Sequence, residues 1–213
     1  MANYNQYCAL AKALDIVGGR WTLLIVRELL IRGACRYTDL RNGLPDIATN
    51  LLADRLRELE DAGVVESEFA PPPTAATLFR LSERGRALEP ILLQLGNWGA
   101  PLLATASKKD AFCSHWMSLP LRQHLRDHAP RRAPIEIELR TGDEPLTICT
   151  RNGEVIARPG AAQTPDLVLR GTPRVLLGLL LGKLSLTAAK SAGLRCDGDA
   201  KALFRIQPMA RRR

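Results

Sequence analysis

Hydrophobic residues recur with the period of an α-helix through residues 37–62 of the chain. The pattern predicts a short helix over residues 37–42, a turn at residues 43–45, and a longer helix over residues 48–62. Pro45 cannot continue the first helix, and we expect the Asp46 side chain to cap the second. The leucines of the longer helix share one face, whereas Asn50 and Arg57 lie on the opposite face. Two helices joined by a tight turn, the second amphipathic, are typical of a helix-turn-helix.

The segments on either side predict the rest of a small domain. Residues 8–17 and 20–31 are expected to form helices, and the second is apolar on nearly every side, so it should be buried. Residues 64–69 and 77–81 are rich in β-forming residues and predict two short strands joined by a loop. Ser82 should then cap a further helix that runs to about residue 105. Two strands that directly follow a recognition helix form a wing.

The second half begins at a polar junction, Lys108-Lys109-Asp110, and its pattern soon changes. Two helical pieces are expected first, at residues 111–119 and 120–127. Alternating apolar and polar residues then predict four strands, over residues 135–140, 146–151, 154–158 and 166–170. Asn152-Gly153 between two of these runs indicates a tight hairpin. Three helices should close the chain, over residues 173–181, 185–192 and 199–205.

Composition limits the classes of protein that fit. With 46% hydrophobic residues in 213, the chain can bury two small cores. No apolar run is long enough to cross a bilayer and the N-terminus lacks signal-peptide regions, so we expect a cytoplasmic protein with no membrane partner. The five cysteines are scattered and never form a C-x-x-C pair, which argues against a zinc site or a disulfide framework. No nucleophile–base pair, phosphate loop or paired carboxylate site is recognisable, so we expect no cofactor and no enzymatic activity.

The formal net charge of +8 is unevenly distributed. Residues 1–110 hold 13 basic and 13 acidic side chains, whereas residues 111–213 hold 17 basic and 9 acidic ones. Three of the basic residues form the C-terminal tail Arg211-Arg212-Arg213. The helix-turn-helix half is therefore neutral, and bulk charge gives no support to DNA binding by that half.

The first half resembles the HxlR-type winged helix-turn-helix transcriptional regulators. The resemblance covers residues 7–106 and includes the motifs G-G-R-W-T at residues 18–22 and D-L-R-N-G-L-P at residues 39–45. It implies a homodimer, with the N-terminal and last helices of this half at the interface, bound to a pseudo-palindromic double-stranded operator DNA. The wing loop APPPTAAT departs from expectation because it has no basic residue, which leaves Arg80 as its nearest cation.

The second half resembles a sterol-carrier-protein-like domain over residues 134–206. The matching segments are DLVLRGTP, LLGLLLGKLSL and AGLRCDGDAKALFRI. The resemblance implies an α+β domain in which helices cover a mostly antiparallel sheet and enclose an apolar tunnel for lipid-like molecules. The predicted organisation is thus a DNA-binding and dimerisation domain over residues 1–107 and an effector-binding domain with a basic tail over residues 108–213.

One leucine-rich stretch is a candidate lining for an effector pocket. Its members are Leu176, Leu177, Leu180, Leu181 and Leu184. The same stretch also fits a helix that is simply buried against a sheet. Both interpretations can hold together, because the lining of a cavity is a core surface that is not filled.

Several polar side chains of the helix-turn-helix are candidates for DNA contact. Asn50 and Arg57 carry the amide and guanidinium groups that form paired hydrogen bonds with adenine and guanine edges. Thr49 and Arg41 are placed for backbone phosphates, as are Arg36 and Thr38. Arg55 falls on the apolar face and is better explained as a structural ion pair.

Cysteine and histidine side chains are further candidates for chemistry. Cys8 begins the first helix, where the helix N-terminus favours a thiolate, and similar regulators sense oxidants with such a cysteine. Cys35, beside Arg36 in a loop, is a second candidate thiol. His124 and His128 stand one helical turn apart, but no third metal ligand accompanies them, so we expect no metal site.

Two functions fit the sequence. The first is a homodimeric transcriptional regulator, favoured as a repressor, that a small hydrophobic effector in the C-terminal domain controls. The alternative is a regulator that senses oxidants or electrophiles through Cys8, with the C-terminal domain as a structural or lipid-carrier module.

Overall fold

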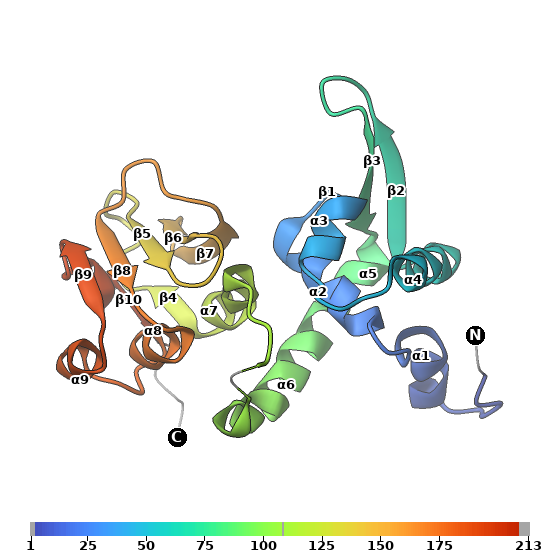
Figure 1. Ribbon diagram of the computed structural model, residues 1–213, viewed down its shortest axis with the longest axis horizontal. Coiled ribbons are helices and arrows are strands. Elements are labelled where there is room, and N and C mark those ends of the chain that lie inside the picture. The colour runs from blue at the N-terminus through green and yellow to red at the C-terminus, as the bar shows by residue number, and fades with distance from the viewer. Residues whose placement is uncertain (1–2, 108, 209–213) are drawn as a thin grey trace. The chain divides into compact units, whose positions relative to one another are not determined.

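The computed structural model describes residues 3–107 and 109–208 of the protein (Figure 1). The chain divides into two compact units, Met1–Ala106 and Ser107–Arg213, and each unit has its own hydrophobic core. Within the described ranges, no helix has the length and apolar character needed to cross a membrane. The predicted basic tail, residues 211–213, lies outside the described residues.

The first unit combines helices with a three-stranded antiparallel sheet in the order β1-β3-β2. Its elements in chain order are α1 (Ala9–Val17), α2 (Thr22–Arg32), β1 (Cys35–Arg36), α3 (Tyr37–Asn42), α4 (Thr49–Asp61), β2 (Val65–Ala70), β3 (Ala76–Leu81), α5 (Glu83–Arg86), α6 (Glu89–Gly99) and the 3-10 helix η1 (Ala100–Thr105). The β2–β3 hairpin projects from the helices as a wing, as Figure 1 shows. The predicted winged helix-turn-helix is confirmed.

The core of the first unit explains the position of α4. Leu52, Leu56 and Leu59 on α4 are at most 2% exposed, and they pack in one cluster with Ile25 and Leu29 of α2. The apolar stripe of α4 therefore faces inward, as its spacing predicts. Its other side is left for solvent.

Two details of this unit differ from the sequence prediction. Asp46 does not cap the second helix: the N-cap is Ala48, without a side-chain bond, and Asp46 lies in the turn at φ 68°. The single helix expected from Ser82 is broken into α5, α6 and η1, although Ser82 Oγ does accept a hydrogen bond from Gly85 N as a cap. Pro90 occupies the first turn of α6, where its missing N–H costs nothing, and so begins a new helix.

The second unit contains a five-stranded sheet in the order β7-β6-β5-β8-β9 and a separate two-stranded sheet. Its elements are the 3-10 helix η2 (Ser114–Met117), α7 (Ser118–His124), β4 (Leu125–Asp127), β5 (Glu136–Arg140), β6 (Leu146–Arg151), β7 (Glu154–Pro159), β8 (Leu167–Arg170), α8 (Pro173–Leu180), α9 (Leu186–Ser191), β9 (Arg195–Gly198), α10 (Ala202–Arg205) and β10 (Ile206–Pro208). Within the large sheet only the β5–β8 pairing is parallel. The predicted α+β class with a mostly antiparallel sheet is confirmed.

One face of the large sheet carries the core of this unit. Ile137 and Leu139 of β5 and Leu167 of β8 are fully buried, and they form one cluster with Leu121 of α7 and Leu176 of α8. The hairpin at Asn152-Gly153 has positive φ at both residues, 51° and 86°, as a tight turn of this type requires.

The segment around Asp127 is not the helix that its sequence predicts. Helix α7 ends at His124, and the next three residues form β4, which pairs antiparallel with β10. Asp127 also forms a two-pronged ion pair with Arg205 of α10, with Nε–Oδ1 and Nη2–Oδ2 distances of 2.7 and 2.9 Å. The hydrogen bonds from Arg205 lower the pKa of the Asp127 carboxyl. A lowered pKa in the folded state means that folding favours the ionised carboxylate. The pair therefore stabilises the second unit at pH values above the ordinary pKa of aspartate.

We predict that Asp127→Asn lowers the free energy of unfolding of the second unit by about 3 kcal/mol at neutral pH, because the Arg205 side chain, which is only 10% exposed, loses its counter-ion. The difference in free energy of unfolding between the wild type and the variant should shrink as the pH falls from about 5 through the lowered pKa of Asp127. Urea unfolding of both proteins across this range measures the difference. Glu154→Gln, at an exposed carboxylate of the same unit, is the control and should change stability little.

Candidate DNA-binding surface

A buried polar cluster holds the helix-turn-helix in shape. The Glu28 carboxylate of α2 is fully buried and accepts hydrogen bonds from Arg27 at 2.8 Å and from Arg32 at 3.3 Å. Arg27 also donates to the carbonyl of Gly43, in the turn between α3 and α4, at 3.3 Å. A Cβ at Gly43 would overlap the Glu28 carboxylate. The turn therefore requires glycine at this position.

A second link joins the two helices directly. The Tyr37 hydroxyl on α3 donates to the backbone carbonyl of Thr49 at 2.6 Å. Leu40 and Leu44 are at most 1% exposed and belong to the core against which Tyr37 packs. The first turn of α4 is thus fixed by one directional bond and by packing.

The proposed base-reading residues lie on the outer side of α4. Thr49 and Asn50 occupy its first turn and are exposed, and Asn50 Oδ1 accepts a hydrogen bond from Leu51 N at 3.0 Å. Arg57 lies two turns further along with its side chain 71% exposed, and it forms an ion pair with Asp54. Both side chains can reach a ligand in solvent, although Arg57 must first separate from Asp54.

The proposed phosphate-contacting residues lie on α3 and around the wing. Thr38 and Arg41 are exposed on α3. Arg36 precedes α3 and donates to the Thr74 carbonyl in the wing loop at 3.0 Å, so the structure joins it to the wing. Arg80 stands on β3 and forms ion pairs with Glu66 at 3.1 Å and with Glu68 at 3.8 Å. The wing thus presents an arginine between two carboxylates.

Sequence reasoning missed the acidic partners of these arginines. Asp54 and Arg57 are three residues apart on one helix, a spacing that brings side chains together. Glu66 and Arg80 are directly paired across the β2–β3 hairpin, which only the strand register reveals. Arg55 forms an ion pair with Glu58, as its place on the apolar face predicts.

The two candidate thiols have different environments. Cys8 is exposed and precedes the first residue of α1. Cys35 is buried in β1, and burial raises the pKa of its thiol to about 12. The predicted loop position of Cys35 is wrong, since the residue lies in β1. A buried thiol with this raised pKa is a weaker candidate for a reactive thiolate than the exposed Cys8.

The two histidines considered for a metal do not share a helix. His124 ends α7 with Nδ1 2.9 Å from the Pro120 carbonyl, whereas His128 follows β4 with Nε2 3.3 Å from the Gln207 carbonyl. Within residues 3–107 and 109–208, no group of three or more His, Cys, Asp or Glu side chains is arranged to hold a metal ion.

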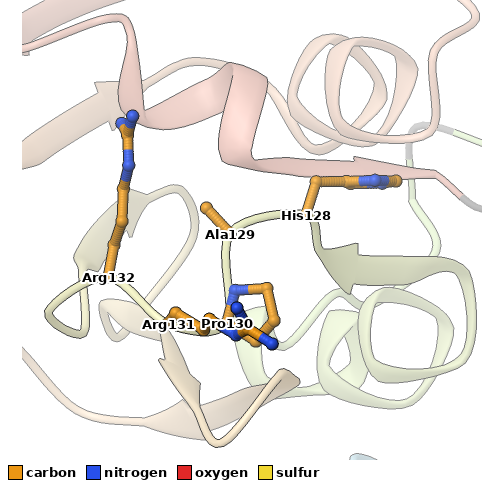
Figure 2. Close-up of a pocket in the computed structure, with 5 residues that line it drawn as sticks. All are labelled: His128, Ala129, Pro130, Arg131 and Arg132. Carbon is orange, nitrogen blue, oxygen red and sulfur yellow. The ribbon is translucent and has the colours of Figure 1, made fainter.

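The candidate effector leucines lie on and just after α8. Leu176 and Leu180 are buried in the core of the second unit, and Leu177 and Leu184 pack against that core while remaining half-buried. Leu181 is also half-buried. An open pocket of about 320 Å³ lies elsewhere in the unit, in the loop after β4, lined by His128, Ala129, Pro130, Arg131 and Arg132 (Figure 2).

A neutral amphipathic helix-turn-helix with a wing defines a transcriptional regulator of the winged helix-turn-helix class. Residues 16–107 match the HxlR-like helix-turn-helix family, and residues 123–211 match the SCP-2 sterol transfer family. This protein belongs to the HxlR-like helix-turn-helix family of transcriptional regulators.

Similar proteins match its first half. The uncharacterized HTH-type transcriptional regulator YvaP of Bacillus subtilis is 36% identical over 97 residues, which are 45% of this chain and 89% of YvaP. YdeP of the same organism is 36% identical over 92 residues, 43% of this chain and 71% of YdeP. The solved structure of a putative HTH-type transcriptional regulator ytcD has 33% identity, covers 46% of this chain and 98% of its own, and gives a TM-score of 0.42.

Proposed function

We propose that this protein is a homodimeric repressor that reads operator DNA with α4 and responds to a small apolar effector in its second unit. The observation that carries the first part is the geometry of α4. Its leucines are buried, and Asn50 and Arg57 are exposed on the side away from the core. The proposed contacts to backbone phosphates come from Thr49, Arg41, Thr38 and Arg36, with a further contact from Arg80 on the wing.

The dimer is supported by apolar side chains that the first unit leaves in solvent. Helix α6 has no buried residue, and its Trp98 is 76% exposed. Leu102 and Leu103 in η1 are 64% and 69% exposed, and Leu10 on α1 is 67% exposed. Exposed apolar side chains on these three helices fit a surface that a second copy buries. A two-fold dimer would present two α4 helices to the two half-sites of an operator.

Control by an effector needs a ligand that prefers one dimer geometry over the other. The proposed ligand is apolar because Leu177, Leu181 and Leu184 stand at the edge of a leucine-rich core and remain half-buried. An apolar molecule that wedges between α8 and its neighbours would complete the burial of these side chains. In this proposal residues 1–107 bind DNA and dimerise, and residues 108–213 bind the effector.

The second candidate function is thiol sensing, and one observation favours it. Cys8 is exposed at the start of α1, the helix whose Leu10 is part of the proposed dimer surface. Oxidation of Cys8 to a sulfenic acid would place a polar group beside that surface and disturb the dimer. In this case the second unit would have a structural or lipid-carrier role.

We predict that Asn50→Ala combined with Arg57→Ala abolishes most sequence discrimination. The loss should be roughly 30-fold or more, since each paired contact to a base contributes at least about 1 kcal/mol. The measurement compares affinity for a duplex selected by the wild-type protein with affinity for random duplex. Asp61→Asn, in the last turn of the same helix, is the control. An unchanged ratio of the two affinities in the double variant contradicts the assignment.

We predict that Trp98→Arg converts the dimer to a monomer without unfolding the first unit, because Trp98 is not part of the core. Light scattering after size-exclusion chromatography reports the mass. Phe204→Arg is a matched control, since Phe204 is 69% exposed but belongs to the second unit. A variant that remains dimeric would place the interface elsewhere.

The two modes of control are separated by Cys8→Ser. Under the effector proposal, apolar ligands release DNA equally from the wild-type protein and from this variant, because neither Leu177 nor Leu181 is affected. Under the thiol proposal, hydrogen peroxide releases DNA from the wild type only. Electrophoretic mobility shifts with each reagent in turn show which mode operates.

A further inference from the structure

Three arginines stand side by side at one end of the five-stranded sheet. In the strand register, Arg140 of β5 is paired with Arg170 of β8, and Arg170 is paired with Arg195 of β9. These strands are direct neighbours, as Figure 1 shows, and neighbouring strands lie about 4.8 Å apart. All three residues are exposed. We call Arg140, Arg170 and Arg195 the arginine row.

The row lies on the sheet face that is turned away from the core. Leu139 and Leu169, one residue before Arg140 and Arg170, are fully buried in the core. Cys196, one residue after Arg195, packs against the same core. Since successive side chains of a strand point to opposite faces, the three guanidinium groups share the other face.

Such a row is electrostatically unfavourable by itself. Like charges placed directly opposite each other across strands destabilise a sheet. Arg140 is partly neutralised, since it forms an ion pair with the buried Glu138. Among the described residues, neither Arg170 nor Arg195 has a carboxylate within ion-pair distance. A charged residue on an edge strand prevents pairing with another chain, which explains Arg195 on the edge strand β9. It does not explain Arg170, because β8 has a neighbouring strand on each side.

The charge balance of the two units indicates which anion would complete the row. Residues 3–107 hold 11 basic and 12 acidic side chains, and two of the candidate DNA contacts, Arg57 and Arg80, are already paired with carboxylates. Residues 109–208 hold 15 basic and 10 acidic side chains. Sequence-independent affinity for DNA comes from basic side chains that displace counter-ions from phosphates. The first unit is poorly equipped for this, whereas the second has the required surplus.

We propose that the arginine row binds backbone phosphates of duplex DNA, so that the second unit adds to the weak sequence-independent attraction of the nearly neutral first unit. This inference rests on the proposed DNA-binding function and adds a second contact surface to it. Guanidinium groups suit the task, because each can donate two parallel hydrogen bonds to one phosphate.

The test removes two of the three charges in the full chain with Arg170→Gln and Arg195→Gln. Arg140 is retained because its loss would leave the buried Glu138 carboxylate without its ion-pair partner. The matched control is Arg131→Gln with Arg151→Gln, which removes the same charge from exposed arginines. In the antiparallel β5–β6 pair Leu139 is level with Leu146, so Arg140 is level with residue 145. Arg151 is therefore six residues along β6 from the level of the row, or about 20 Å away.

Binding of a fluorescent random-sequence duplex of about 40 base pairs is followed by anisotropy at several salt concentrations. The slope of log affinity against log salt should fall by about 1.8 in the row variant, since each phosphate contact contributes about 0.9. Between about 50 and 200 mM salt, these two contacts account for a roughly 12-fold fall in wild-type affinity that the row variant would not show. The control should keep the wild-type slope.

Several outcomes would overturn the proposal. One is an unchanged salt slope in the row variant, and another is an equal fall of the slope in the control variant. A third is an unchanged slope for DNA together with lost binding to vesicles that contain phosphatidylserine. A second variant, Arg170→Lys with Arg195→Lys, keeps both charges and should retain the slope, which guards against a folding defect. The proposed function is checked separately with Asn50→Ala, which should lose discrimination between selected and random duplex while keeping the slope. Failure of the row would leave that discrimination intact.

Discussion

The carboxylate of Glu28 is the group around which the first unit is arranged. It is fully buried, and an ionised carboxylate away from water costs several kcal/mol unless charged donors surround it. Arg27 and Arg32 supply those donors from the same helix, and Arg27 extends the network to the carbonyl of Gly43. Apolar packing alone allows one helix to slide over another, whereas hydrogen bonds of fixed direction do not. The turn before α4 is therefore held in one place relative to α2.

The distribution of charge gives the two units different physical characters. In the first unit the arginines on the outer surface of α4 and of the wing are joined to nearby carboxylates, which keeps that surface close to neutral. Such a surface exerts little long-range attraction on an anion such as DNA, so any sequence preference would have to come from close contacts with bases. In the second unit most of the basic residues are exposed, and Arg140, Arg170 and Arg195 are among those on the sheet. If α4 reads bases and the arginine row binds phosphates, as proposed, specificity and general affinity can be changed independently by mutation.

Local sequence signals predicted the elements that local forces determine. Helix α3 and strand β6 begin and end at the predicted residues, because proline, glycine and alternating patterns mark their ends. Asp46 failed as a cap because the chain needs a left-handed turn at that residue, which moves the start of α4 to Thr49. Strand β4 was mistaken for helix because its partner, β10, lies about eighty residues away and no local pattern reveals the pairing. The ion pairs of Arg57 and Arg80 depend on side-chain geometry and strand register, which the sequence alone does not give.

The pairing of β4 with β10 has a consequence for how the protein is made. Strand β10 and Arg205, the ion-pair partner of Asp127, are synthesised about eighty residues after β4 and Asp127. Until these later residues emerge from the ribosome, Asp127 lacks its partner Arg205 and β4 lacks the strand with which it pairs. The first unit depends on no later segment for its own core, so it can fold while the rest is still being synthesised. A nascent chain would thus carry a finished helix-turn-helix before its second half can close.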